Sequence, residues 1–449
     1  MTDATLIRDA LLVNEGRSFE SDLLVRHGRI ERIDRELSAP DGARVVEARG
    51  RWLLPGMIDD QVHFREPGLT HKGDIHSESR AAVAGGVTSF MDMPNTRPTT
   101  TDLDALEAKY QAAAQRSAAN YAFYLGATND NIDVIRSLQP GQACGIKVFM
   151  GASTGNMLVD DEETLQLIFR DAPTVVATHC ESTPMIQANL ERALAKYGEH
   201  IPLEEHPRIR SAEACMASTE VAVGLAREHG TQLHVLHLST AREVALFEPG
   251  PVTAKSITAE VCVHFLHFTE QDYAERGTAI KCNPAVKSAA DQQGLLQGLV
   301  DDRLDIIATD HAPHTREEKA DPSYLKAPAG MPLVQHVLVA ALELHFDGRM
   351  DVARVVEKVA HNPALRFGVE ERGFLREGAW ADLALVDPEG GTEVTRDALL
   401  YRCGWSPFEG RRFRARVDAT WVNGQLAWDG REVIEHGAAR RLSFAQRRA

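Results

Sequence analysis

Between residues 55 and 374, short apolar segments alternate with amphipathic segments of helical length. VTSFMDMPN is followed by TDLDALEAKYQAAAQR, CGIKVFMG by DEETLQLIFRDA, and TVVATHCES by PMIQANLERALAKYG. Such alternation is typical of strand–helix units, whose strands pair in parallel and are covered by the helices. Repeated along this part of the chain, it predicts an α/β fold, a (β/α)8 barrel of the TIM type. The active site of such a barrel lies where the strands end.

Both ends of the chain lack this alternation and contain short strand-like segments instead. ATLIRDALLVNEG and ESDLLVRHGRIERID lie near the start, and FLREGAWADLALVDP and FRARVDATWVNGQLAWDG lie near the end, the last with an Asn-Gly pair typical of hairpin turns. We expect residues 1–54 and 375–449 to form one discontinuous β-sandwich domain beside a barrel of residues 55–374. The length of 449 residues also allows two or three ordinary domains.

Composition limits the partners and the compartment. A charged content of 25% and a hydrophobic content of 43% are those of a soluble globular protein, and the net charge of -16 disfavours nucleic acid. The basic end, RRLSFAQRRA, is predicted to be a short solvated tail. The six cysteines are scattered without a Cys-x-x-Cys pair, which favours reduced thiols in a cytoplasmic enzyme. No signal segment and no membrane-spanning window of about 20 apolar residues is expected.

The stretch from Pro55 to Gly68, PGMIDDQVHFREPG, combines an apolar approach with a cluster of polar groups. Side chains two apart share one face of a strand, so Gln61 and His63 point the same way, with Arg65 just beyond. Two imidazoles at this spacing would hold one metal ion, but Gln61 is a poor zinc ligand. The stretch resembles the signature of dihydroorotases in the amidohydrolase superfamily, Asp-x-His-x-His-Phe-Arg-Glu-Pro-Gly, with Gln61 at the first histidine position. This resemblance also implies a β-sandwich beside the barrel.

Further residues with metal-binding chemistry occur inside or at the ends of apolar strands. A lysine inside a strand, as at Lys147, is costly unless it is paired or deprotonated. The resemblance implies that Lys147 reacts with carbon dioxide to give a carbamate that bridges two metal ions. His179 and His237 end apolar strands and are predicted ligands, whereas His234 faces the other side of its strand. Asp310, at a strand end, is predicted to bind metal and to move a proton.

Each of these residues, taken alone, also has a structural interpretation. A core lysine can extend its ammonium outward, a histidine can be packed or solvated, and an aspartate can cap a turn or helix. The combination of Lys147, His179, His237 and Asp310 favours metal binding over these structural roles.

Four residues are expected to bind the substrate. Arg65 can hold a carboxylate through a bidentate fork. The resemblance assigns Arg65, Asn95 and His314 to a substrate carboxylate, and Asn283 to a position near the ring. Both asparagines stand beside a proline and are also typical turn formers, and the sequence PAVKS after Asn283 departs from the Pro-Pro-Leu-Arg of the family. The segments GASTGNMLVDD and His314 to Lys319 are predicted loops beside the site.

The resemblance implies a zinc-dependent cyclic amide hydrolase of pyrimidine synthesis. The reaction would be the reversible hydrolysis of L-dihydroorotate to N-carbamoyl-L-aspartate by metal-activated hydroxide. One ion would be held by His63, the Lys147 carbamate and Asp310, and the other by the carbamate, His179 and His237. Because Gln61 removes one imidazole from the first set, we expect one firmly held zinc ion, or a second one at low occupancy.

Two alternatives stay open. The chain could be a non-catalytic dihydroorotase-like scaffold for an aspartate carbamoyltransferase, or a related enzyme, an allantoinase or a dihydropyrimidinase. The expected partner is a small-molecule substrate, with no nucleic acid and no membrane. A homodimer and an association with an aspartate carbamoyltransferase are left open.

Overall fold

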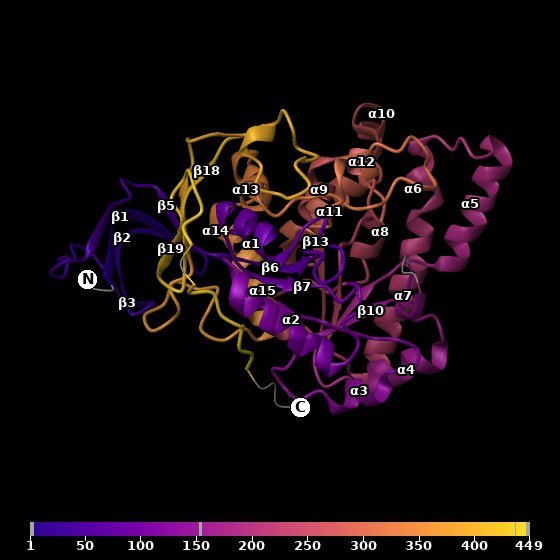
Figure 1. The fold of residues 1–449 in the computed structure, drawn as a ribbon, viewed down its shortest axis with the longest axis horizontal. Helices are drawn as coiled ribbons and strands as arrows, with labels where there is room; N and C mark the ends of the chain where they lie inside the picture. The colour runs from indigo at the N-terminus through magenta and orange to yellow at the C-terminus, as the bar shows by residue number, and fades with distance from the viewer. Residues whose placement is uncertain (1–3, 152–154, 436, 446–449) are drawn as a thin grey trace.

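The computed structural model describes residues 4–151, 155–435 and 437–445, and it contains one sheet built from both ends of the chain (Figure 1). The strand order of this eight-stranded sheet is β19-β18-β15-β5-β1-β2-β3, with β4 paired to β1. Its strands are β1 (Ala4–Asn14), β2 (Arg17–Arg26), β3 (Arg29–Asp34), β4 (Arg44–Glu47), β5 (Trp52–Pro55), β15 (Leu383–Asp387), β18 (Arg416–Val422) and β19 (Gln425–Trp428).

The antiparallel pair β5–β15 joins the two ends of the chain, with Leu53 opposite Leu385. The predicted hairpin turn at Asn423 and Gly424 is present between β18 and β19, and both residues have a positive φ, 49° and 76°. The sheet packs around its own core, which includes Ile7 and Trp421. The predicted sheet domain of both termini is therefore confirmed, while its exact boundaries at residues 54 and 375 stay a prediction.

A parallel barrel follows β5 in the chain. Neighbouring strands pair in parallel in the orders β6-β7-β8 and β9-β10-β11-β12-β13-β14, and a bridge between Val62 and His311 connects the first strand to the last. Tyr124 separates β8 from β9, which together occupy one strand position. The strands are β6 (Met57–Val62), β7 (Val87–Asp92), β8 (Asn120–Phe123), β9 (Leu125–Gly126), β10 (Ile146–Phe149), β11 (Val176–His179), β12 (Leu233–Val235), β13 (Ile257–Cys262) and β14 (Ile306–Ala308). The predicted (β/α)8 barrel is confirmed.

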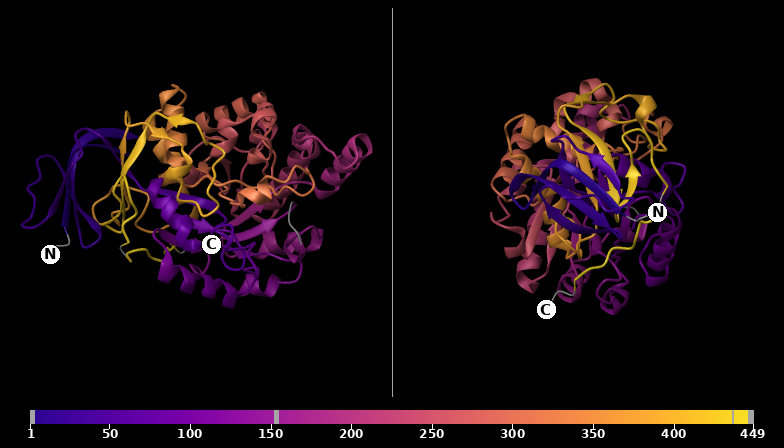
Figure 2. Two further views of the ribbon diagram at one scale, coloured as in Figure 1. Left: turned by 45° about the horizontal axis from the view of Figure 1, so that its top comes forward. Right: turned by 90° about the vertical axis from the view of Figure 1, so that its left-hand side faces the viewer.

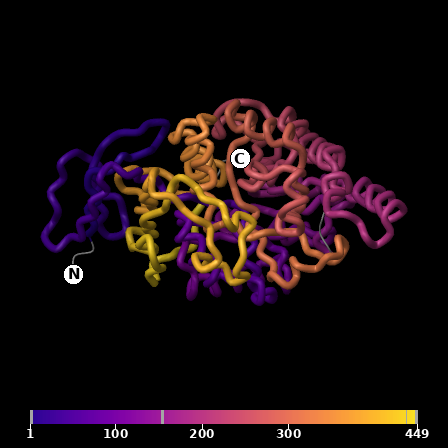
Figure 3. Tube along the Cα trace, turned by 90° about the horizontal axis from the view of Figure 1, so that it is seen from above, coloured from indigo at the N-terminus to yellow at the C-terminus, as the bar shows by residue number. Residues whose placement is uncertain are grey.

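Helices surround the barrel, and the sheet of the two termini lies at one end of the molecule (Figures 2 and 3). The helix α5 lies at the opposite end (Figure 1). The helices are α1 (Ile75–Ala84), α2 (Leu103–Arg116), α3 (Ile132–Ser137), α4 (Glu162–Asp171), α5 (Thr183–Tyr197), α6 (His206–Ile209), α7 (Ala212–His229), α8 (Ala241–Val244), α9 (Val263–His267), α10 (Tyr273–Arg276), α11 (Ala289–Val300), α12 (Arg316–Lys319), α13 (Val337–Phe346), α14 (Val352–Val356) and α15 (Asn362–Phe367). Aspartate or serine caps several of them, as at Asp102 before α2 and Ser211 before α7.

Of the basic C-terminal segment, residues 440–445 are docked at one buried position rather than fully solvated as their composition suggests, and residues 446–449 lie outside the described residues. Leu442 is 2% exposed, and its backbone N–H donates to the carbonyl of Tyr121 in β8. The Arg441 guanidinium pairs with Glu107 and lies over the ring of Tyr110. The segment docks because its apolar residue and its cation both find partners on the barrel, a long-range pairing that composition does not indicate.

In the described part of the chain, none of the helices has the length and apolar character that crossing a membrane requires.

Candidate functional site

The polar residues that follow the barrel strands meet in one cavity of about 220 Å³. They come from the ends of different parallel strands, which converge at the same end of a barrel. Every site residue that the sequence predicted lines this cavity, together with Gln61: His63, Arg65, Asn95, Lys147, His179, His237, Asn283, Asp310 and His314. The structure thus brings all of them together, although it does not test the role assigned to each.

The segment after β6 is held in a turn by hydrogen bonds of its backbone N–H groups and by a close contact at Gly68. The His63 N–H donates to the carbonyl of His311 at 2.7 Å, and the Phe64 N–H donates to Asp92 Oδ1 at 2.8 Å. Gly68 has a φ of +82°, and a Cβ there would lie 1.9 Å from the carbonyl oxygen of Arg97. These contacts fix the direction in which the chain leaves β6 and so carry Arg65 to the cavity.

One group of candidate ligands is centred on Asp310. His63 Nδ1 donates to Asn95 Oδ1 at 2.7 Å, and His63 Nε2 lies 3.1 Å from Asp310 Oδ1. Gln61 Nε2 donates to the same carboxylate oxygen at 3.2 Å. Since the amide oxygen of Asn95 only accepts, Nδ1 of His63 carries a proton, and Nε2 is the ring atom directed at Asp310. A cation is the partner that both groups fit.

The second group contains His179 and His237, whose Nδ1 and Nε2 atoms lie 3.0 Å apart. His179 Nε2 lies 2.8 Å from Glu181 Oε2, and Arg210 is bonded to the same oxygen. Burial lowers the pKa of both imidazoles, so both are neutral at pH 7. With its Nε2 proton directed to Glu181, His179 presents Nδ1 as a ligand atom. A carboxylate that orients a histidine in this way is typical of metal sites.

Lys147 lies in β10, lines the same cavity as these two groups and is 1% exposed. Burial lowers the pKa of its ammonium to about 8, although Asp310 and Glu260 act in the opposite direction. A lysine of lowered pKa supplies more of the neutral amine that reacts with carbon dioxide. The histidines, the carboxylate and a convertible lysine therefore fit a divalent metal centre, because their nitrogen and oxygen atoms converge in one cavity.

Arg65 and His314 lie in contact with each other and form one wall of the cavity. Arg65 Nε donates to the carbonyl of Pro313 at 2.9 Å, and Nη2 lies 3.1 Å from His314 Nε2. Burial lowers the pKa of Arg65 to about 10, so the guanidinium is still charged at pH 7. Burial, and then Arg65 and Lys72, lower the pKa of His314 well below its usual range. The wall is thus a buried cation beside a neutral imidazole.

The remaining predicted parts of the site are two loops and Asn283. Asn283 Oδ1 is buried and has no hydrogen-bond partner in the described residues. Of the predicted loop GASTGNMLVDD, residues 152–154 lie outside the described residues, and Gly155–Met157 form a 3-10 turn. The segment after His314 is the short helix α12 rather than a loop, because Thr315 and Glu318 form a capping box.

Sequence reasoning missed two groups of residues near the site. Glu181 and Arg210 orient His179, and the only sequence signal is that Glu181 stands two positions after it. His234, set aside in favour of His237, points into the barrel beside Asp60 and Glu260. β12 ends at Val235, before His237, which has a φ of +42°.

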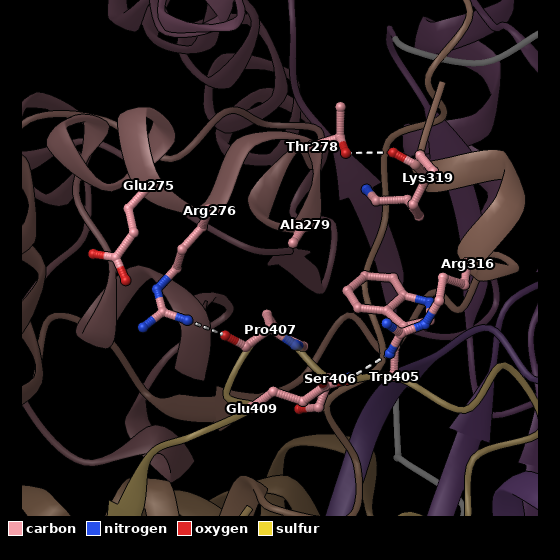
Figure 4. Close-up of a pocket in the computed structure, with 11 residues that line it drawn as sticks. Glu275, Arg276, Thr278, Ala279, Arg316, Lys319, Trp405, Ser406, Pro407 and Glu409 are labelled. Carbon is pink, nitrogen blue, oxygen red and sulfur yellow. Dashed lines mark hydrogen bonds and ion pairs between the residues drawn. The ribbon is translucent and has the colours of Figure 1, made fainter. Parts of the chain in front are cut away.

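A larger cavity of about 340 Å³ lies elsewhere, between α10, α12 and the segment around Trp405 (Figure 4). None of the predicted site residues lines it. Its arginines already have partners, because Arg276 donates to the carbonyl of Pro407 and Arg316 pairs with Glu409. The smaller cavity at the strand ends is therefore the candidate functional site.

Comparison with known proteins agrees with this geometry. The model of the amidohydrolase family matches residues 52–427. The chain is 36% identical to a dihydroorotase of Halobacterium salinarum over 431 residues, covering 95% of this chain and 97% of the relative. It is 33% identical to an allantoinase of Deinococcus radiodurans over 435 residues, covering 95% of this chain and 96% of the relative.

Among solved structures, the L-hydantoinase (dihydropyrimidinase) of Arthrobacter aurescens is similar with a TM-score of 0.92 and 28% identity. The match covers 99% of this chain and 100% of the hydantoinase chain. With a family match over most of its length and full-length relatives above 30% identity, the chain belongs to the amidohydrolase family.

Proposed function

We propose that this chain is a cyclic amide hydrolase acting on a ring that carries a carboxylate, namely a dihydroorotase. It would interconvert L-dihydroorotate and N-carbamoyl-L-aspartate in pyrimidine synthesis. The observation that supports this substrate is the guanidinium of Arg65. It is 8% exposed, lines the cavity and has no ion pair with a carboxylate within the described part of the chain. A buried cation without an anion is costly, so a substrate carboxylate is the partner that fits.

Hydrolysis adds water across the ring amide, so a C–N bond breaks and the ring nitrogen gains a proton. A divalent metal, when bound, would polarise the carbonyl and lower the pKa of water. One ion would be held by the Lys147 carbamate, His179 and His237. A second ion would be held more weakly by His63 and Asp310. Arg65 would hold the carboxylate and keep the ring in register. Asp310 contacts His63 and Gln61 through Oδ1, so Oδ2 would carry the proton to the leaving nitrogen.

The allantoinase and L-hydantoinase relatives make an uncharged ring the main alternative substrate. Purified full-length chain, supplied with zinc and bicarbonate, should be assayed on L-dihydroorotate, allantoin and dihydrouracil. We expect kcat/KM to be at least about 100-fold higher for dihydroorotate, because the other two rings leave Arg65 unpaired. Equal or faster turnover of allantoin or dihydrouracil would overturn the carboxylate proposal. Metal-loaded protein that opens none of the rings would favour the scaffold.

A further inference from the structure

Three ionisable side chains meet inside the barrel, on the side of the candidate site toward the N-terminal ends of the strands. They are Asp60 of β6, His234 of β12 and Glu260 of β13, each 0% exposed. His234 Nε2 lies 3.3 Å from Asp60 Oδ2 and 3.2 Å from Glu260 Oε2, and one ligand atom of each residue lies within 4.8 Å of the others. None of these residues lines the candidate active-site cavity.

The hydrogen bonds of His234 determine which nitrogen faces the carboxylates. Its Nδ1 lies 2.8 Å from Thr258 Oγ1, and that hydroxyl donates its own proton to the carbonyl of Leu233. The hydroxyl therefore accepts from Nδ1–H, so Nε2 is the nitrogen that faces the two carboxylates. Nε2 and two carboxylate oxygens point at one another, an arrangement that attracts a positive charge, either a proton on Nε2 or a metal ion that replaces it.

The carboxylate of Asp60 is a second, independent sign of a missing partner. Both of its oxygens are buried, and neither has a hydrogen-bond partner in the part of the chain that the structure describes. The contact of Oδ2 with His234 is close but lacks the alignment of a hydrogen bond. Enclosing an unpaired carboxylate is strongly unfavourable, whereas coordination to a metal ion compensates for it.

We infer that Asp60, His234 and Glu260 bind a divalent cation of the zinc class, separate from the metal centre of the candidate active site. Zinc-to-nitrogen and zinc-to-oxygen distances place the ligand atoms of a tetrahedral site about 3.3 Å apart, which matches the two contacts of His234. Two carboxylates, a neutral imidazole and a divalent ion have no net charge, which suits full burial. Asp60 Oδ1 is available as a fourth ligand atom.

This enclosed site connects to the candidate active site through Glu260. Glu260 Oε2 faces His234, while Oε1 accepts the backbone N–H of His237 at 3.0 Å. A cation that fixes the Glu260 carboxylate would therefore also hold the backbone of His237, which has a positive φ. The inference does not depend on which ring the chain hydrolyses.

Zinc analysis of chain expressed in zinc-supplemented medium tests the site. The His179→Ala/His237→Ala double variant removes two candidate ligands of the open cavity, and we expect it to retain about one zinc per chain. Adding His234→Asn to this double variant introduces an amide that can still donate to Thr258 but removes the Nε2 ligand. Zinc should then fall at least about tenfold. The matched control adds His336→Asn instead, at a buried histidine beside Tyr401, and should keep the zinc.

A double variant that folds but holds no zinc would overturn the inference, since protons would then neutralise the cluster. Wild-type chain provides a test that needs no substitution. Dialysis of the native protein against a chelator should strip ions from the open cavity and leave one enclosed zinc per chain. Complete loss of zinc while the chain stays folded contradicts the site. Neither measurement uses turnover, so failure of the proposed activity would not be mistaken for failure of this site.

Discussion

Replacing Glu181 by glutamine tests whether the geometry of His179 is imposed from outside the metal centre. Glu181 is 0% exposed, and its Oε2 faces His179 Nε2 at 2.8 Å and is also bonded to Arg210. Glutamine keeps the volume but removes the charge, so His179 Nδ1 is less firmly directed at the ion. Loss of such an orienting carboxylate weakens metal binding 10- to 100-fold, or by about 1.4 to 2.7 kcal/mol. Competition with a chelator measures this affinity.

The same substitution should reduce the stability of the metal-free chain. Arg210, whose side chain is 16% exposed, would lose its carboxylate partner, at a cost of about 1.5 to 3 kcal/mol. Although burial alone would raise it, Arg210 and the bond to His179 lower the pKa of Glu181 from 4.5 to about 2. The stabilisation is therefore complete above pH 4.5 and is lost as the pH falls toward 2, and denaturant unfolding at several pH values would measure it.

The matched control is Glu243→Gln, which removes a buried carboxylate bonded to Thr219 and Thr240 but not to a candidate ligand. Its zinc affinity should equal that of the wild type. If Glu181→Gln also binds zinc within about twofold of the wild type, the orienting role of Glu181 is wrong.

Four further changes have defined outcomes. Arg65→Met should raise KM for dihydroorotate and cost about 2 to 4 kcal/mol in kcat/KM, and unchanged kinetics would reject its role as carboxylate anchor. Gln61→His should increase the zinc bound per chain by strengthening the site of His63 and Asp310, and an unchanged metal content would contradict our account of Gln61. Gly68→Ala should destabilise the chain by about 2 to 4 kcal/mol in denaturant unfolding, because of its positive φ and the clash with Arg97; wild-type stability would refute this. Burial lowers the pKa of Lys319 from 10.5 to about 7, so at pH values between these two the unfolded chain binds more protons than the folded chain. The free energy of unfolding of the wild type minus that of Lys319→Met should therefore rise with pH over this range, by at most about 1.4 kcal/mol per pH unit. A difference that does not change with pH would contradict the lowered pKa.

The barrel and the cavity could be predicted because they depend on local patterns. Alternating apolar strands and amphipathic helices allow few architectures, and parallel strands bring their polar ends to one face. For this reason residues as far apart as His63 and Asp310 could be placed in one site before any contact was known, whereas His314 was placed there through the family resemblance. The docked C-terminal segment around Leu442 could not be predicted, because its partner strand lies more than 300 residues earlier in the chain.

The sequence by itself determined the fold class, the sheet shared by both termini and the polar residues that line the cavity. Only the tertiary structure decided which atoms face one another. It directs Nδ1 of His179 toward His237 by placing Glu181 on the other nitrogen, and it brings Asp60 and Glu260 to His234 inside the barrel. Strand periodicity fixes the side on which a residue lies. The rotamer, the proton position and the partner across the barrel depend on packing between segments distant in sequence.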